Sequence, residues 1–419
     1  MEDQKMRPPA RTLLECSNDD QLCKVRTYEY EVIVVPVFLV GVTIILLAII
    51  LWLRYRGWKS RRKQPQGHLA QESHRVVSSG ISLEEPSLEN VLRTKDPSLL
   101  ALEIPSERIR QPSLQQIGEG RFGPLYKTGL REQDAVPGKE VVIKQLKDSA
   151  EPSEVRDFLQ RAAFQAWLGT HPHLVDIIGC CSEQKPFCMV LECVEPGSLL
   201  QFLWDCRRDV VSLHGILYDI TECQVYIIAL QILSALEFLQ ERNLVHGDVA
   251  ARNVVIQHNF TTKLTGLGGA CEMHSRGSFP IRRPTPLKWM APERLLHLSA
   301  SSKSDVWSFG ILLYELVTLG APPFPEVPPS SILQHLQRGN IMKRPSSCKQ
   351  NLYNIMKSCW AWKVSDRISL SELRKRLENG KKTSNDRTVL QVPELVIHEL
   401  YEGVAGTEPV KMETDYTVL

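Results

Sequence analysis

The chain contains 419 residues, of which 43% are hydrophobic and 23% charged, with 24 glycines and 26 prolines. This composition excludes collagen-like, largely disordered and disulfide-scaffold proteins. The formal net charge is only +2, so the charge balance gives no indication of a nucleic-acid partner.

The first predicted element is a membrane-spanning helix at residues 32–53. These 22 positions carry no charge, and at about 1.5 Å per residue they extend roughly 33 Å, enough to cross a bilayer. A cleavable signal peptide is disfavoured, because the apolar run is long and starts late. Residues 54–63 hold six basic and no acidic side chains, which places the carboxyl-terminal side in the cytoplasm. We therefore expect a single-pass protein of the plasma or endosomal membrane, with its amino terminus outside.

The regions beside the predicted span differ in character. Residues 1–31 are too few to build a core unaided, and Cys16 and Cys23 within them form a disulfide, pair with another chain or remain thiols. Residues 54–113 are basic at first and then lack any Phe, Trp or Tyr from position 64 onward. This predicts a flexible linker, interrupted by a short helix around residues 84–93. The nine later cysteines, Cys180 to Cys359, lack metal-ligand spacing, so we expect reduced packing residues.

A folded domain is predicted to follow, opening with the segment IGEGRFGPLYK. Gly118, Gly120 and Gly123 have the spacing that lets a hairpin backbone approach phosphate groups, with Phe122 at its tip; a simple glycine turn explains the same spacing. About 25 residues later, the strand EVVIKQLK carries Lys144 between apolar neighbours on one face. Such a lysine suits phosphate binding better than a solvated edge position.

The segment HGDVAARNVV places Asp248 and Asn253 in a loop after an apolar helix, which itself starts with a capping box at Thr221 and Gln224. A carboxylate there can accept a hydroxyl proton, and a carboxamide can bind a metal. Taken alone, the loop favours a capping aspartate and a turn asparagine.

Taken in order, these motifs resemble a protein kinase, and specifically a receptor-type tyrosine kinase, over about 265 of the 419 residues. The resemblance includes APE at residues 291–293, SDVWSFG and CWAWKVSDR. The sequences AAR at 250–252 and PLKWMAPE are similar to the tyrosine-specific branch. The resemblance implies an α+β bilobal kinase fold at residues 114–378, with a small β-rich lobe and a larger helical lobe, followed by a cytoplasmic tail at residues 379–419.

The resemblance also implies roles for single residues. Asp248 would be the catalytic base, beside Arg252 and Asn253, and Leu191 would be the gatekeeper before a hinge at residues 192–197. Asp305 would brace the catalytic loop, and Arg367 would pair with Glu293. The residues that would contact ATP are Ile117, Gly118, Glu119, Gly120, Arg121, Phe122, Gly123, Leu125, Val142, Lys144, Leu191 and Val255.

Two departures from the family pattern affect the chemistry directly. Gly266 stands where a metal-binding aspartate is usual, so Asn253 is left as an incomplete metal site and weak binding of ATP and Mg²⁺ is expected. A nearby carboxylate such as Glu272 is the alternative ligand. Arg161 stands where a glutamate usually pairs with the strand lysine, and we expect it to pair locally with Asp157 instead.

Other departures concern regulation and pocket size. Gly247 replaces the catalytic-loop arginine, and residues 266–293 contain no tyrosine, so no phosphotyrosine switch is expected there. Ser275, Ser278 and Thr285 remain as candidates for modification. Val142 replaces a smaller alanine and should narrow the nucleotide pocket.

The tail contains two tyrosines that are candidates for adaptor docking after phosphorylation, Tyr401 and Tyr416. Tyr416 also begins a Y-x-x-Leu sorting pattern, and Thr417, Val418 and Leu419 resemble a carboxyl-terminal docking ligand. Such short patterns are frequent by chance.

These observations leave two main hypotheses. In the first, the chain is a membrane-tethered pseudokinase, or severely impaired kinase, that recruits partners and self-associates in the membrane. In the second, it is a weak tyrosine kinase that transfers the γ-phosphate of ATP with Asp248 as base. Nucleotide binding without transfer is a third, lesser alternative.

Overall fold

The computed structural model describes residues 39–43, 52, 87–109, 114–131, 138–207, 218–278, 286–392 and 398–405. The chain divides into two units, Met1–Ser82 and Leu83–Leu419. Most of the predicted span lies outside the described residues, and the described positions within it, residues 39–43 and 52, are helical. One described helix, α6 (Glu222–Glu241), is long and apolar enough to cross a membrane, but it is a core helix inside the second unit, 56% buried. It therefore carries no argument for the span at residues 32–53.

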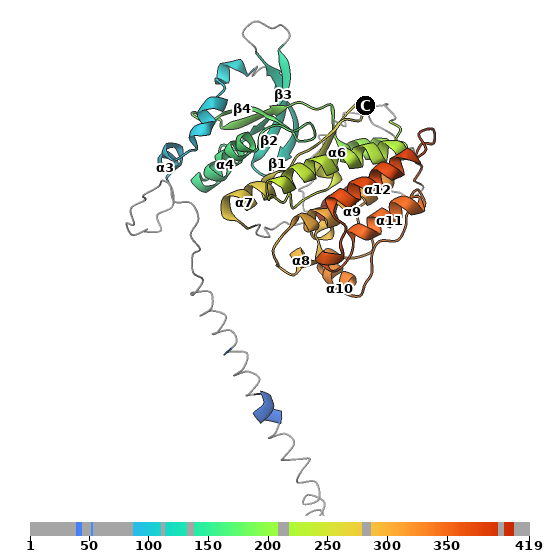
Figure 1. Ribbon diagram of the computed structural model, residues 1–419. Coiled ribbons are helices and arrows are strands. Elements are labelled where there is room, and N and C mark those ends of the chain that lie inside the picture. The colour runs from blue at the N-terminus through green and yellow to red at the C-terminus, as the bar shows by residue number, and fades with distance from the viewer. Residues whose placement is uncertain are drawn as a thin grey trace, which may run out of the picture. The chain divides into compact units, whose positions relative to one another are not determined.

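The second unit has a small lobe built on a five-stranded antiparallel sheet in the order β1-β2-β3-β5-β4 (Figure 1). In β3, Val141 and Ile143 point to a buried face while Val142 and Lys144 alternate with them on a half-buried face, as the pleat requires. The strands are β1 (Gln115–Gly120), β2 (Gly123–Leu130), β3 (Lys139–Gln145), β4 (Ile177–Cys181) and β5 (Cys188–Glu192).

One long helix, α4 (Pro152–Leu168), packs against this sheet. Its start is fixed by a capping box between Glu151 and Glu154 and by Pro152 in the first turn, which satisfy or remove exposed backbone donors. Its buried face includes Val155, Phe158, Leu159 and Ala162, a helical spacing that seals one side of the small lobe.

The small lobe begins earlier than the linker prediction allows. Three short helices, α3 (Leu88–Arg93), η2 (Pro97–Leu102) and η3 (Ser106–Arg108), precede the sheet, and Leu99 is fully buried. The Glu103 carboxylate accepts hydrogen bonds from the Ser182 amide (2.9 Å) and hydroxyl (2.6 Å). The expectation of a flexible linker is therefore wrong for residues 87–109, because spaced apolar residues there complete the core. The short helix expected at residues 84–93 is confirmed as α3.

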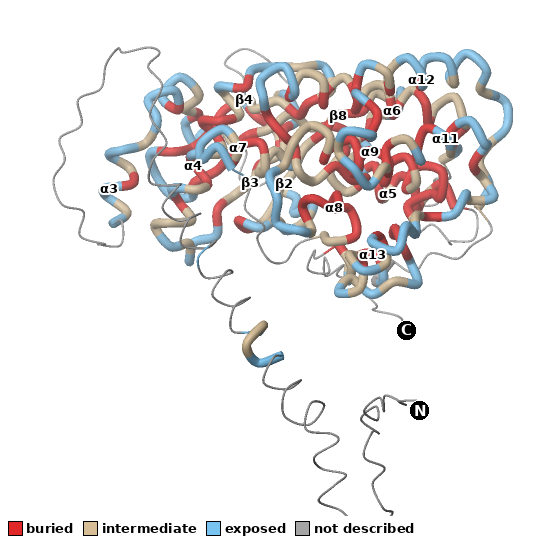
Figure 2. Tube along the Cα trace, turned by 60° about the horizontal axis from the view of Figure 1, so that its bottom comes forward, coloured by how far each residue is buried: buried red, intermediate tan, exposed pale blue. Residues whose placement is uncertain are grey.

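The larger lobe is mainly helical, with α6 and α9 at its centre (Figure 2). The capping box at Thr221 and Gln224 is present as expected. A three-stranded sheet, β6-β7-β8, borders the small lobe. The remaining elements are β6 (Pro196–Ser198), α5 (Leu199–Asp205), η5 (Ala251–Asn253), β7 (Val254–Gln257), β8 (Thr262–Leu264), α7 (Gly268–Arg276), η6 (Leu287–Trp289), α8 (Pro292–Leu295), α9 (Ser302–Val317), η7 (Pro329–Ser331), α10 (Ile332–Gln337), α11 (Gln350–Cys359), η8 (Val364–Asp366), α12 (Leu370–Lys382) and α13 (His398–Ala405).

The two bracing interactions expected in this lobe are both present. Asp305 accepts hydrogen bonds from the amides of His246 (2.7 Å) and Gly247 (2.8 Å). Arg367 and Glu293 form two parallel hydrogen bonds of 2.8 and 2.9 Å. Burial opposes ionisation of Glu293, but its bonds to Arg367 hold the pKa of this carboxyl below its ordinary value.

The buried pair yields a stability prediction. Arg367→Ala leaves the Glu293 carboxylate buried without its charge partner, so the free energy of unfolding should fall by about 3–5 kcal/mol. Arg376→Ala is the matched control, because Arg376 pairs with Glu372 at the surface, with side chains 47% and 46% exposed; this change should stay within about 0.5 kcal/mol. Urea unfolding of the two variants measures the difference, and equal losses would contradict the argument.

Candidate active site

The catalytic loop brings three predicted site residues together. The Asp248 carboxylate contacts the Arg252 guanidinium and accepts a hydrogen bond from Asn253 Nδ2 (2.7 Å), which also donates to the Asp248 carbonyl (2.8 Å). Burial opposes the charge on Arg252, yet Asp248 raises the pKa of that guanidinium. Asp248 is therefore held as an oriented carboxylate, the form a base requires.

Gly266 has a backbone conformation that glycine adopts without strain. Its φ is +80°, which is the left-handed region that disfavours residues with a Cβ. A Cβ at this position would lie 3.0 Å from Asn253 Oδ1. The Asn253 side chain thus approaches the backbone at the point where a metal-binding aspartate is usual.

The donor set around Asn253 does not fit the ordinary magnesium site of a kinase. Mg²⁺ requires hard oxygen ligands, usually carboxylates together with substrate phosphates. Gly266 supplies no side-chain oxygen, and the alternative carboxylate, Glu272, pairs with Arg161 (3.4 Å) on α4. The structure thus engages Glu272 elsewhere and leaves the site one ligand short.

The helix α7 that follows Gly266 packs along α4. Arg161 pairs with Glu272 across this contact, and Asp157 lies 3.9 Å from Arg276. The rings of Trp167 and His274 add a close contact, with centroids 3.9 Å apart. The expected local pair is therefore corrected: Glu272 forms the ion pair with Arg161. Burial lowers the pKa of Arg161, and the charges of Glu272 and Asp157 oppose this shift.

Lys144 faces a cation where the family pattern has a glutamate. Burial lowers the pKa of Lys144, and the nearby Arg161 lowers it further. Within the part of the chain that the structure describes, no carboxylate forms an ion pair with Lys144. The lysine therefore lacks the partner that normally orients it towards phosphate.

Phe122 lies at the tip of the glycine-rich loop as predicted, in the turn between the paired Gly120 and Gly123, but its side chain is buried. It is 5% exposed, and its ring meets that of Phe158 edge to face, with centroids 5.5 Å apart. The Arg161 guanidinium lies 5.2 Å from the Phe122 ring centroid, within the range of cation–π attraction. The ring at the loop tip is therefore turned inward onto α4, because burial of an apolar ring is favourable.

The other predicted ATP contacts lie where the two lobes meet. In the β1–β2 hairpin, Gly118 is paired with Leu125 and Gly120 with Gly123. Glu119 lies between the two glycines of β1, and Arg121 follows Gly120 in the turn. Ile117 is 49% exposed. Val142 is paired with Leu191 across β3 and β5, and Val255 lies in β7, paired with Lys263 of β8. In the hinge, Glu192 accepts hydrogen bonds from Lys263 (2.5 Å) and from the Asp176 amide (2.8 Å).

Tyr401 is not presented for adaptor docking in this structure. Its side chain is 1% exposed and its hydroxyl donates a hydrogen bond to Glu315 Oε1 (2.5 Å). The docking prediction stays a prediction, because an adaptor could reach Tyr401 only after the side chain has left this buried position. Tyr401, Val404 and Ala405 have the i, i+3, i+4 spacing of a buried helical face, and this was the available signal in the sequence for α13.

The remaining predicted sites are either placed without a special role or lie outside the described residues. The Ser275 hydroxyl donates to the Cys271 carbonyl (2.7 Å) within α7, and Ser278 is exposed. The nine cysteines from Cys180 to Cys359 are free thiols, as expected. The residues that lie outside the described part are Cys16, Cys23, Thr285, Tyr416, Thr417, Val418 and Leu419.

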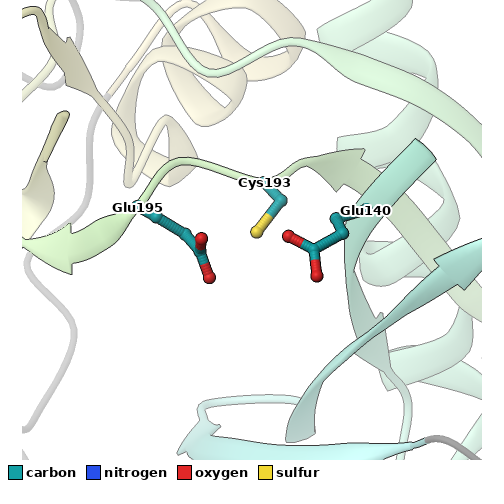
Figure 3. A group of neighbouring side chains, drawn as sticks. All are labelled: Glu140, Cys193 and Glu195. Atoms are coloured by element: carbon teal, nitrogen blue, oxygen red, sulfur yellow. The ribbon is translucent and has the colours of Figure 1, made fainter. Parts of the chain in front are cut away.

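One further cluster, Glu140, Cys193 and Glu195, brings three side chains of metal-binding type together (Figure 3). The Lys127 ammonium already lies between the two carboxylates, 3.3 Å from Glu140 and in contact with Glu195. Glu195 in turn raises the pKa of Lys127. The cluster is therefore a surface ion-pair network with its own cation.

Comparison with known proteins agrees with this geometry. A model of the family described as protein tyrosine and serine/threonine kinase matches residues 112–377, so the chain belongs to the protein kinase family. It is a tyrosine-kinase-like protein related to STYK1: tyrosine-protein kinase STYK1 of Homo sapiens is 51% identical over 98% of this chain and 99% of its own length. The protein of the same name from Mus musculus is 50% identical over 98% of each chain. The transforming protein Abl of Abelson murine leukemia virus is 34% identical over 63% of this chain and 33% of its own.

The α4–α7 contact can be tested by neutralising charges. Arg161→Gln and Glu272→Gln each leave one charge without its partner, while the double variant removes both charges and introduces no new carboxylate beside Lys144. The coupling free energy from the double-mutant cycle should be about 1 kcal/mol or more, because these side chains are only 19% and 10% exposed. The same cycle on Asp157 and Arg276 should give a smaller value, since Arg276 is 47% exposed. A coupling near zero at Arg161 would contradict the assignment.

The backbone at Gly266 gives a second prediction. Gly277 also has positive φ, at +63°, but an added Cβ there meets nothing within 4 Å. Gly277→Ala should therefore cost about 1 kcal/mol of unfolding free energy from the backbone alone. Gly266→Ala should cost at least about 1 kcal/mol more, because its Cβ also presses on Asn253. Chemical denaturation measures the free energy of unfolding of both variants. Equal losses in the two variants would contradict a close contact between the added Cβ at position 266 and Asn253.

Proposed function

We propose that this chain is a membrane-tethered, tyrosine-kinase-like signalling protein that acts as a pseudokinase, or as a severely impaired kinase, by recruiting partners. The observation that carries the proposal is the pairing of Arg161 with Glu272 beside Lys144, which forms an ion pair with no carboxylate among the described residues, together with the missing carboxylate at Gly266. Phosphoryl transfer depends on both a positioned lysine and bound metal. Loss of even one electrostatic donor typically lowers a rate by about 10²- to 10³-fold.

Weak binding of ATP and Mg²⁺ is part of this proposal. It is supported by the incomplete donor set at Asn253 and by Phe122, whose ring is buried against α4 instead of covering phosphates. The extra methyl groups of Val142 relative to alanine narrow the adenine side of the site.

Membrane tethering is proposed from the sequence. The uncharged stretch at residues 32–53 and the basic flank at 54–63 support a single span with the kinase-like domain in the cytoplasm. Among the relatives, the tyrosine-protein kinase receptor torso of Bombyx mori is 30% identical over 73% of this chain and 43% of its own length. We place the protein in the plasma or endosomal membrane, where confinement favours self-association.

Partner recruitment is assigned to the domain surface and the tail. Tyr416 and the terminal residues Thr417, Val418 and Leu419 are the candidate docking elements for protein adaptors. A nucleic-acid partner is not proposed, because the net charge is close to zero.

A weak tyrosine kinase is the second candidate, and one observation favours it. Asp248, Arg252 and Asn253 are hydrogen-bonded together in an orderly catalytic loop. In this alternative Asp248 takes the proton of a substrate tyrosine, Lys144 holds phosphate oxygens and Asn253 binds the remaining metal.

Radiolabelled phosphate transfer distinguishes the two candidates. We expect the full chain, purified in detergent from a host without tyrosine kinases, to transfer phosphate from ATP no faster than its Asp248→Asn variant. Transfer that Asp248→Asn abolishes would establish the kinase instead. Thermal unfolding with ATP, with and without Mg²⁺, measures binding separately, because a nucleotide that binds only the folded state raises its apparent stability. A rise of several degrees that needs Mg²⁺ would contradict weak metal binding.

A further inference from the structure

The tail helix α13 is seated on the larger lobe through a single aromatic side chain. Tyr401 lies between Trp204 of α5 and Trp289 of η6, with ring centroids 5.8 and 5.2 Å away and near-perpendicular planes. Edge-to-face packing of this kind adds to the attraction from buried area. α13 also contacts η6 directly, and η6 belongs to the PLKWMAPE segment.

The hydroxyl end of Tyr401 reaches a buried carboxylate. It donates to Glu315 Oε1, while Glu315 Oε2 accepts from the Ala251 amide (3.0 Å) in the catalytic loop. Glu315 is 0% exposed, and burial raises its pKa to about 7. Burial also raises the pKa of Tyr401, so the phenol remains a donor.

A phosphate on Tyr401 is incompatible with this seat. Phosphorylation replaces the donating proton with about 1.5–2 negative charges. These would lie against Glu315 in a buried site, where repulsion is screened weakly. The Arg252 guanidinium also lies near Tyr401, but the phenol oxygen is already 2.5 Å from Glu315 Oε1, which leaves no room for a phosphate between them. Tyr401 can therefore be seated or phosphorylated, but not both.

We propose that Trp204, Trp289 and Glu315 form a tyrosine-binding site, here named the tail pocket, whose occupant is Tyr401 of the same chain. While it is occupied, α13 covers η6 and keeps peptide ligands away from that segment. Phosphorylation of Tyr401 releases α13, which exposes both η6 and a phosphotyrosine for an adaptor. The reaction transfers the γ-phosphoryl group of ATP, supplied with an external tyrosine kinase, to the phenol oxygen, whose proton is lost to solvent as ADP leaves.

The form of α13 supports this occupant. Its buried residues, Tyr401 and Ala405, lie one turn apart, and the half-buried Val404 packs beside them, whereas Leu400 is 58% exposed. One face of α13 is therefore buried against the larger lobe, and the opposite face is exposed to solvent. The inference deepens the proposed function, on which it rests for the recruiting role of the tail, but the seat itself is independent of phosphate transfer by this chain.

Hydrogen–deuterium exchange of the full chain in detergent, without nucleotide, tests the seat. We expect slow exchange at residues 398–405 and 286–291 in the wild type. Tyr401→Phe should accelerate both segments by about tenfold, the factor that one hydrogen bond supplies, and Tyr401→Ala should accelerate them further. Leu400→Ala, on the exposed face of the same helix, is the matched control and should change neither. If Tyr401→Ala leaves residues 286–291 unchanged, the tail pocket is overturned.

Two further measurements define the occupant and its release. Protection at residues 398–405 should be independent of protein concentration; protection that rises with concentration would assign the pocket to the tail of a second copy and overturn the assignment to the same chain. An added soluble tyrosine kinase should phosphorylate Tyr401 at least about tenfold more slowly in the chain than in a synthetic peptide of residues 394–408, since it acts on the open form. Equal rates would overturn the proposal. Both results stand whether or not this chain is itself a kinase.

Discussion

Two carboxylates on one buried helix hold the catalytic loop at both ends. Asp305, in the first turn of α9, accepts the amides of His246 and Gly247, and Glu315, near the end of α9, accepts the amide of Ala251. Burial raises the pKa of both carboxyls, and the hydrogen bonds from the loop amides oppose that rise. The helix thus fixes the loop that carries Asp248, Arg252 and Asn253, independently of whether the chain transfers phosphate.

The small lobe shows the opposite situation, in which the enzymatic arrangement has been replaced. With a cation at position 161, Lys144 loses its carboxylate, and the activation segment supplies Glu272 to neutralise Arg161. The Phe122 ring then lies against the same guanidinium. The ion pair and the cation–π contact of Arg161 therefore both contribute to the packing of α7 on α4 and to the inward turn of the Phe122 ring.

The parts predictable from sequence were those set by local pattern or by ordered motifs. The capping box at Thr221 and the short helix α3 follow from residue type and spacing, whereas the interactions of Asp305 and Arg367 were implied by the resemblance to the kinase family. The partner of Arg161 could not be predicted, because Glu272 is 111 residues away and is brought to α4 only by the tertiary fold. The ordered structure of residues 87–109 could not be predicted for a related reason. A few apolar residues, such as Leu99, are enough to order a segment when the tertiary fold buries each of them.

Tyr401 illustrates how a single residue can be read in two ways that are both physically sound. In an extended tail, a tyrosine beside acidic residues is a docking motif, whereas at helical spacing with Val404 and Ala405 it is an anchor. The structure favours the anchor because Glu315 gains a donor and the ring gains two aromatic neighbours. Since the other oxygen of Glu315 holds the catalytic loop, the tail and that loop share one buried charge. Any event that removes Tyr401 from Glu315 must therefore be felt at Ala251, next to the residues that would define the chemistry.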